Sequence, residues 1–169
     1  MTDLPDVNVW LALADENHSH HEKARTYWQD QSSPEIAYCR VTALSFLRLS
    51  THPKVLSRPL TPAEAWDIYQ RYRIEAHVAL VEDAPEIDAE FMTLSRSEDF
   101  AHHLWTDCYL VALARFRDCR IVSFDTDFKR FPALNFLYLT GQPNHQPPPH
   151  HVNTQGLTGS STPGKNDRQ

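Results

Sequence analysis

Four aspartates stand where carboxylates can act together on one ligand. Asp6 closes a short first segment, Asp107 opens an apolar helix, and Asp125 and Asp127 follow the apolar run 121–124. In open α/β sheets ligands bind at the carboxyl ends of the strands, so acids at those ends carry more weight than acids on helix faces. Clustered carboxylates raise one another's pKa unless a cation neutralises them, and hard cations prefer oxygen ligands. We therefore expect a Mg²⁺ or Mn²⁺ site, the kind that activates water for attack on a phosphodiester.

Each aspartate taken singly also has an ordinary structural explanation. Asp107 fits a first-turn acid that the helix dipole favours, and Asp125 fits a turn residue. What favours a shared site is the combination: two acids after an apolar strand, one at the start of a buried helix and one at the end of the first segment.

The elements that must hold these acids alternate between strands and helices. Short apolar runs predict strands in the first segment and at residues 35–38, 77–81, 120–124 and 135–139. Helical spacing of apolar residues predicts helices at residues 7–14, 19–28, 41–50, 61–72, 85–97 and 106–117. This order predicts an α/β fold in which a short, mainly parallel sheet is sandwiched by α-helices.

Two of these helices carry start signals in the sequence. Ser19 with Glu22 fits a capping box, and Thr61 with Glu64 fits another, with Pro62 at the first helical position. We expect both helices to begin at these caps.

The positions of the glycines exclude several classes of function and indicate where the folded part of the chain ends. All four lie at or beyond Gly141, so residues 1–140 can contain no glycine-rich phosphate loop, dinucleotide fingerprint or nucleophile elbow. Val152 and Leu157 are the only aliphatic side chains after residue 140. We expect one domain at 1–140 and a disordered tail at 141–169.

Charge and cysteine content limit the partners and the compartment that suit this protein. The formal net charge of −6 repels polyanions unless basic side chains are segregated. The three cysteines show no CxxC spacing, which argues against a disulfide framework and a thiolate zinc site and fits a reducing cytoplasm. No apolar run approaches the ~20 residues that a membrane span requires. We expect a cytoplasmic protein with no membrane partner.

Four motifs occur in order along residues 3–139. They are DVNVWL at 6–11, TALSFLRL at 42–49, TDCYL at 106–110 and SFDTDF at 123–128. In order and spacing they resemble the PIN-domain ribonucleases and, among these, the VapC-type toxins of type II toxin–antitoxin pairs. The resemblance implies a PIN-like fold and a metal-dependent endoribonuclease that cleaves structured RNA such as tRNA or rRNA. It also implies a homodimer and a cognate antitoxin that docks an amphipathic segment into a groove.

The resemblance assigns roles to individual residues. Asp6, Asp107 and Asp125 match the metal-binding acids, and Asp127 matches a further catalytic acid. The polar neighbours of that site are Asn8, Thr106 and Ser123. Basic candidates for substrate binding flank the motifs at Arg40, Arg48, Lys129 and Arg130.

One position departs from the family pattern. A glutamate commonly follows the threonine of the middle motif, and here that residue is Ala43. Because a methyl group cannot bind metal or position water, we expect a weaker or differently arranged metal site. A catalytically weakened PIN-fold scaffold, which binds antitoxin or RNA without cleavage, therefore stays open as the alternative function.

Two further interpretations carry less weight. The run 121–127 also resembles the first motif of haloacid-dehalogenase-like phosphatases, but that motif ends the first strand of a long domain, and Lys129 stands where threonine or valine is expected. His18 and His21 have metal-ligand spacing without an evident third ligand. We assign no function to these two, nor to the pairs at 102–103 and 150–151.

Overall fold

A computed structural model describes residues 1–75, 77–96 and 100–140. Its centre is a five-stranded sheet of order β3-β2-β1-β4-β5 in which every described pairing is parallel. The strands are β1 (Thr2–Pro5), β2 (Glu35–Cys39), β3 (Val78–Val81), β4 (Cys119–Ser123) and β5 (Phe136–Tyr138). The predicted tail at 141–169 lies outside the described residues.

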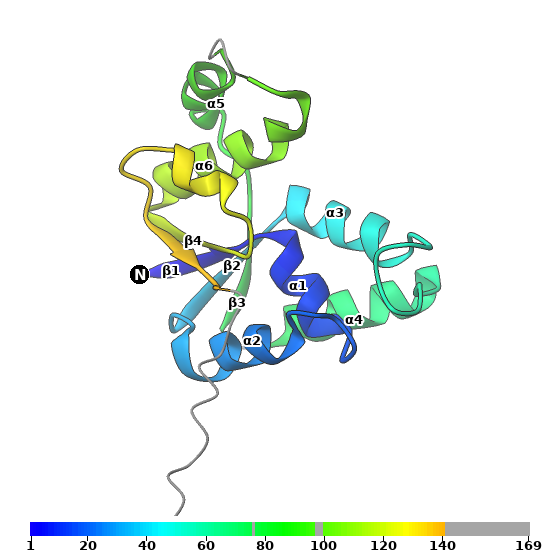
Figure 1. Cartoon of the computed structure of the whole chain (residues 1–169). Coiled ribbons are helices and arrows are strands. Elements are labelled where there is room, and N and C mark those ends of the chain that lie inside the picture. The colour runs from blue at the N-terminus through cyan, green and yellow to red at the C-terminus, as the bar shows by residue number, and fades with distance from the viewer. Residues whose placement is uncertain (76, 97–99, 141–169) are drawn as a thin grey trace, which may run out of the picture.

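Helices cover both faces of this sheet (Figure 1). They are α1 (Val7–Ala14), α2 (His21–Thr26), α3 (Arg40–Ser50), α4 (Pro62–Ile74), α5 (Ile87–Ser95) and α6 (Trp105–Arg117). Shorter turns are the π-helical η1 (Tyr27–Gln31) and the 3₁₀ turns η2 (His102–Leu104) and η3 (Asp127–Arg130). The predicted α/β sandwich is confirmed. None of the helices in the described part of the chain is long and apolar enough to cross a membrane.

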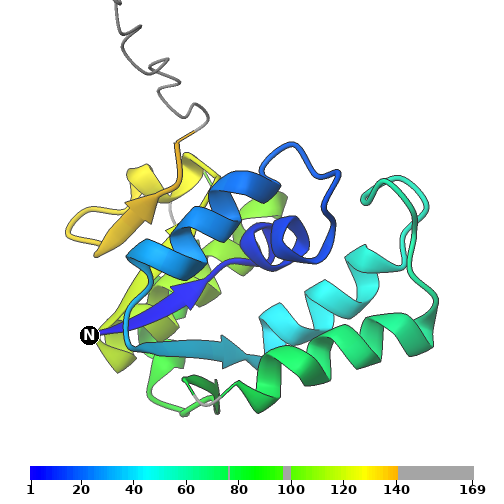
Figure 2. The same ribbon diagram turned by 90° about the horizontal axis from the view of Figure 1, so that it is seen from below.

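The pleat of β2 divides the core between the two helical layers. Ala37 and Cys39 join the cluster that packs under α5 and α6, whereas Ile36 and Tyr38 join the cluster under α1, α3 and α4. Seen along the sheet in Figure 2, α3 and α4 lie side by side beyond the carboxyl ends of the strands. Residues 108–114 of α6 are all buried, as the apolar run in that helix predicts.

The order of the strands fixes where a ligand site can lie. The chain leaves β1, builds β2 and β3 on one side, and then crosses to β4 and β5 on the other. The carboxyl ends of β1 and β4 therefore flank a topological switch point, the place where open parallel sheets bind ligands. Asp6 follows β1 and Ser123 ends β4 at this point.

The two predicted capping boxes have different outcomes. Thr61 Oγ1 accepts a hydrogen bond from Glu64 N, and Glu64 in turn accepts one from Thr61 N, so the box at α4 is confirmed. The box at Ser19 is wrong, because α2 begins at His21 and has no side-chain cap. His18 Nδ1 instead accepts a hydrogen bond from the backbone N–H of His20 at 3.1 Å and holds the preceding turn.

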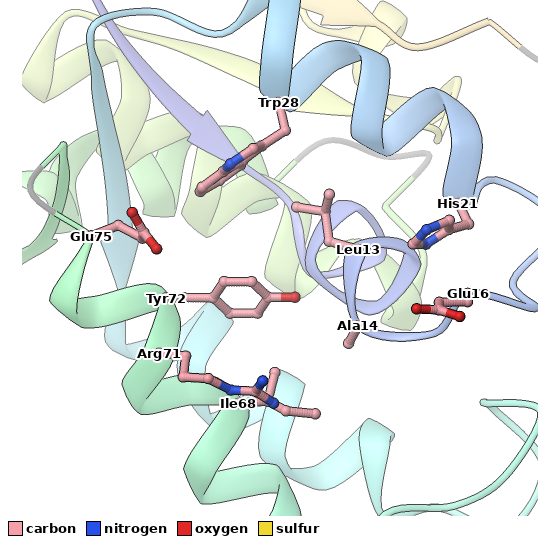
Figure 3. A pocket seen from close by; sticks show the side chains of 9 residues that line it. All are labelled: Leu13, Ala14, Glu16, His21, Trp28, Ile68, Arg71, Tyr72 and Glu75. Carbon is pink, nitrogen blue, oxygen red and sulfur yellow. The ribbon is translucent and has the colours of Figure 1, made fainter.

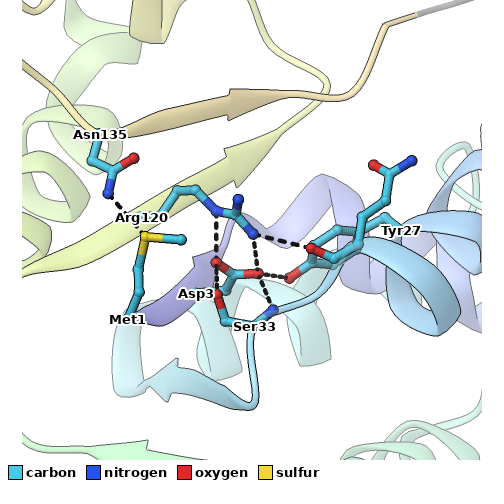
Figure 4. Close-up of polar contacts among 7 residues, drawn as sticks. Met1, Asp3, Tyr27, Ser33, Arg120 and Asn135 are labelled. Carbon is cyan, nitrogen blue, oxygen red and sulfur yellow. Dashed lines mark hydrogen bonds and ion pairs between the residues drawn. The ribbon is translucent and has the colours of Figure 1, made fainter.

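A buried ion pair lies at the amino end of the same strand pair. Asp3, with no exposed surface, accepts from Arg120 Nε at 2.8 Å and Nη2 at 2.9 Å, and Arg120 is its register partner on β4 (Figure 4). Tyr27 and Ser33 donate three further hydrogen bonds to the carboxylate of Asp3. These partners outweigh the desolvation of the buried group and lower the pKa of Asp3.

We predict that Arg120→Met destabilises the protein by about 3 kcal/mol near neutral pH, because it leaves a buried carboxylate without its counter-ion. Since the pKa of Asp3 is lowered in the folded state, the stabilisation is present above the unfolded-state pKa and is lost as the pH falls through the folded-state value. Urea denaturation at several pH values measures both effects. Arg25→Met, which removes an exposed pair, is the control, and an equal effect of the two substitutions would contradict the assignment.

Candidate active site

The core of the site is a hydrogen-bonded junction between the end of β1 and the end of β4. The backbone N–H of Asp6 donates to Val122 O at 2.9 Å, so the parallel ladder continues one residue past β1. Asp6 then caps α1, and its Oδ1 accepts from Val7 N at 2.6 Å. This cap fixes the carboxylate of Asp6 at the switch point.

Two polar side chains hold the other oxygen of Asp6. Asn8 Nδ2 donates to Asp6 Oδ2 at 2.8 Å, and Ser123 Oγ donates to the same oxygen at 3.0 Å. Ser123 Oγ also accepts from the backbone N–H of Asp125 at 3.0 Å, and Asn8 Oδ1 accepts from that of Phe124 at 3.3 Å. Asn8 and Ser123 therefore lie where the motifs predict, and they link Asp6 to the loop that carries Asp125.

Asp107 approaches the junction from the first turn of α6. Burial raises its pKa to about 7, and the neighbouring carboxylates of Asp6, Asp125 and Asp127 add to the rise. Burial also raises the pKa of Asp6 to about 6, against its hydrogen bonds from Val7 and Ser123, and Asp125 adds to this rise. The structure thus brings all four predicted aspartates into one electrostatic cluster.

Asp125 and Asp127 form the outer wall of this cluster. The backbone N–H of Asp127 donates to Asp125 Oδ1 at 2.9 Å, which holds the two acids on one turn at the start of η3. His103 Nε2 lies 3.7 Å from Asp127 Oδ2, and both side chains are exposed. The sequence motifs did not predict His103 at this site, and its only signal is its position just ahead of the TDCYL motif.

The donor set suits a hard divalent cation. All four side chains offer carboxylate oxygens, which Mg²⁺ and Mn²⁺ prefer. Burial, and after it the neighbouring carboxylates, raise the pKa values of Asp6 and Asp107, and a bound cation would favour their ionised forms. In the described part of the chain, no three His, Cys, Asp or Glu side chains lie close enough to share one ion. The acids are neighbours, not a closed coordination shell.

Comparison with known proteins supports the family resemblance that the motifs indicate. The PIN-domain family model matches residues 4–134, a span that contains all four aspartates. The chain belongs to the PIN-domain family. The resemblance drawn from the sequence motifs is thereby confirmed.

Similar proteins place the chain near the VapC ribonucleases. Ribonuclease VapC41 of Mycobacterium tuberculosis is 32% identical over 142 residues, covering 80% of this chain and 97% of the relative. The crystal structure of M. tuberculosis VapC20, described as a sarcin-ricin loop cleaving toxin, superposes with a TM-score of 0.61 at 16% identity over 75% of this chain and 92% of that one. A toxin–antitoxin complex from Klebsiella pneumoniae superposes with a TM-score of 0.57 at 15% identity, over 82% of this chain and 98% of that one. At these identities the two structures support the fold alone.

Ala43 takes a packing role in this PIN domain. Its side chain is 2% exposed and belongs to the apolar cluster that contains Trp10, Tyr38 and Phe46. The neighbouring Thr42 is also buried, with Oγ1 at 3.2 Å from Cys39 Sγ. Ala43 therefore offers no ligand, and the candidate metal ligands are the carboxylates of the other motifs.

The other candidates lie at different distances from the acids. Arg130 on η3 is close enough to Asp107 to oppose the rise in its pKa, whereas Lys129 Nζ lies 4.3 Å from the centre of the Tyr138 ring. Thr106 is partly buried in the first turn of α6, next to Asp107. Arg40 begins α3 at the carboxyl edge of the sheet, and Arg48 lies ~12 Å further along that helix.

The histidines of the α2 region have structural partners. His21 is buried, and its Nδ1 lies 2.8 Å from Ala12 O. The ring of His20 stacks on Phe124 with centroids 4.4 Å apart, beside the Asn8–Ser123 contacts. These contacts agree with the interpretation of His18 and His21 as structural residues, not metal ligands.

We predict that Asp107→Asn stabilises the metal-free protein at pH 8. Because the folded-state pKa of Asp107 is raised from 3.8 to about 7, the folded state loses stability as the pH rises through this range, and the amide removes that loss. The gain is on the order of 1–3 kcal/mol at pH 8 and shrinks toward pH 4. Thermal unfolding in a chelator measures it.

The control is Asp67→Asn, which changes an exposed acid on α4 and should give no pH-dependent gain. A lower melting temperature for Asp107→Asn at pH 8 would contradict the electrostatic account of the cluster.

Proposed function

We propose that this chain is a metal-dependent endoribonuclease and the toxin of a toxin–antitoxin pair. The observation that carries the proposal is the convergence of Asp6, Asp107, Asp125 and Asp127 at the switch point of a PIN-domain sheet. The relatives named ribonuclease VapC support the same activity. Their relation to this chain covers nearly the whole described fold.

In this proposal Asp6, Asp107 and Asp125 hold one or two Mg²⁺ or Mn²⁺ ions. When bound, the ion makes a water molecule a stronger nucleophile and stabilises the charge that develops on the phosphodiester. The water oxygen bonds to phosphorus as the phosphorus–oxygen ester bond breaks, and the RNA is left with a phosphate end and a hydroxyl end. No nucleophile from the protein is needed.

The chain's own residues prepare the site for this reaction. Asn8 and Ser123 fix the orientation of Asp6 before the ligand arrives, because both bind the same carboxylate oxygen. Asp127 lies at the outer wall, where it can accept a hydrogen bond from water or substrate. Thr106 completes the polar rim beside Asp107.

Positive side chains at the rim would attract the RNA backbone. Arg130 interacts with Asp107, and Lys129, Arg40 and Arg48 complete the set that we propose for phosphate contacts. With no base-reading motif in the sequence, selectivity would come from RNA shape. A structured target such as tRNA or rRNA fits the description of VapC20 as a sarcin-ricin loop cleaving toxin.

The decisive experiment incubates the purified, antitoxin-free protein with total cellular RNA, with and without Mg²⁺ or Mn²⁺, and maps new RNA ends. We predict cuts at a few sites that require the cation and are lost in Asp107→Asn, because that variant removes one proposed ligand. Asp67→Asn should cut like the wild type. If the folded wild type makes no cuts, the weakened-scaffold function replaces the ribonuclease.

A groove between α1, η1 and α4 offers a docking place for an antitoxin (Figure 3). Its volume is about 440 Å³. Apolar side chains form its walls and charged ones its rim; the lining residues are Leu13, Ala14, Glu16, His21, Trp28, Ile68, Arg71, Tyr72 and Glu75. An amphipathic segment with apolar anchors and a polar outer face matches this lining.

The groove is connected to the acids through α1. Asp6 caps one end of this helix and Ala14 ends the other, ~12 Å away along the axis. About four extended residues cover that distance, so a peptide seated in the groove can carry a basic side chain to the carboxylates. Such a peptide would block the site, as an antitoxin must.

We predict that Ile68→Asp weakens binding of the antitoxin encoded beside this chain roughly tenfold or more, because it places a charge in an apolar anchor site. Calorimetry with the co-expressed and separated pair measures the affinity. Ile74→Asp makes the same change on α4 at a side chain that is 79% exposed and outside the groove. Equal affinities of the two folded variants would contradict the assignment.

The homodimer and the cytoplasmic location are also part of this proposal. The cysteines Cys39, Cys108 and Cys119 are buried and unbridged, which suits a reducing compartment. Sedimentation of the purified chain tests the dimer.

A further inference from the structure

An exposed tryptophan begins the helix that carries Asp107. Trp105 is the first residue of α6, two positions before Asp107, and it is 52% exposed. The proposed chemistry at the carboxylates makes no use of this ring.

Aromatic neighbours hold the ring of Trp105 in place. Phe100 packs against it edge to face with centroids 4.6 Å apart, and Phe91 on α5 does the same at 5.9 Å. These contacts brace the indole and leave about half of its surface open to solvent. A braced ring loses little side-chain entropy when a flat ligand stacks on it.

The turn before Trp105 lies against the acidic cluster. Residues 102–104 form η2, and His103 of this turn lies 3.7 Å from Asp127. The rings of His102 and His103 are exposed and lie 5.7 Å apart. The stretch 102–107 therefore carries two imidazole rings, the indole of Trp105 and the carboxylate of Asp107 within six residues.

We propose that Trp105 is a stacking platform for an unpaired RNA base next to the scissile phosphate. This inference rests on the proposed ribonuclease function and adds a contact to the bases of the substrate. Aromatic side chains bind splayed-out bases by stacking, and they do so only where the bases are not already stacked in a duplex. The platform therefore selects single-stranded loops and excludes paired RNA.

The test measures binding without cleavage, by fluorescence anisotropy in Ca²⁺ instead of Mg²⁺ or Mn²⁺. The probes are a labelled single-stranded RNA of about 12 nucleotides and a duplex of the same sequence. Trp105→Ala should weaken single-strand binding about tenfold, and Trp105→Tyr should keep most of the affinity, because stacking needs only an aromatic face. Duplex binding should not respond to either substitution.

The matched control is Trp66→Ala. Trp66 on α4 is 47% exposed and lies edge to face with Tyr69, but it belongs to a helix outside the acidic cluster. Its loss should leave RNA binding unchanged.

Three results would overturn the stacking platform. The first is an unchanged affinity of Trp105→Ala for the single strand, and the second is an equal loss of affinity for the duplex. The third is a change in sedimentation of Trp105→Ala without a change in RNA affinity, which would assign the ring to a protein interface. Failure of the wild type to cut RNA in Mn²⁺, with Trp105-dependent binding intact, would reject the ribonuclease and leave the platform standing.

Discussion

The burial of Asp6 and Asp107 among neighbouring carboxylates at one sheet edge is the constraint on which this structure depends. Burial takes Asp6 and Asp107 out of water, and their acidic neighbours make ionisation harder still. Hydrogen bonds from Val7, Asn8 and Ser123 nevertheless hold the carboxylate of Asp6 in place. A proton or a cation relieves the repulsion between the carboxylates. A divalent cation does so at neutral pH while the acids stay ionised and able to act as ligands.

Two contacts on the same pair of strands maintain that arrangement. At the amino end, the buried pair of Asp3 and Arg120 joins residues that are register partners on β1 and β4. At the carboxyl end, the hydrogen bond from Ser123 to Asp6 joins the next step of the ladder beyond Pro5 and Val122. A slip of one residue would break both contacts, so the ion pair that stabilises the sheet also sets the alignment of the site.

The sequence predicted the parts of this molecule that local chemistry decides. The alternation of strands and helices, the cap at Thr61 and the acids at strand ends are all local patterns, and the structure contains them. Ser19 also fits a cap, but His18 organises that turn through a contact that spacing does not reveal. The contact of His103 with Asp127 and the burial of Ala43 depend on tertiary packing of segments far apart in the chain. Sequence spacing holds no information on either.

The most direct test of the central claim is a carbon-13 NMR titration of the aspartate carboxyl groups, with and without Mg²⁺. In the metal-free protein, the carboxyl group assigned to Asp107 should titrate near its raised pKa of about 7. Saturating Mg²⁺ should move this titration below the ordinary aspartate value of about 4, because the bound cation favours the ionised form. An ordinary pKa of Asp107 that Mg²⁺ does not change would show that the four acids do not interact electrostatically and do not bind the ion.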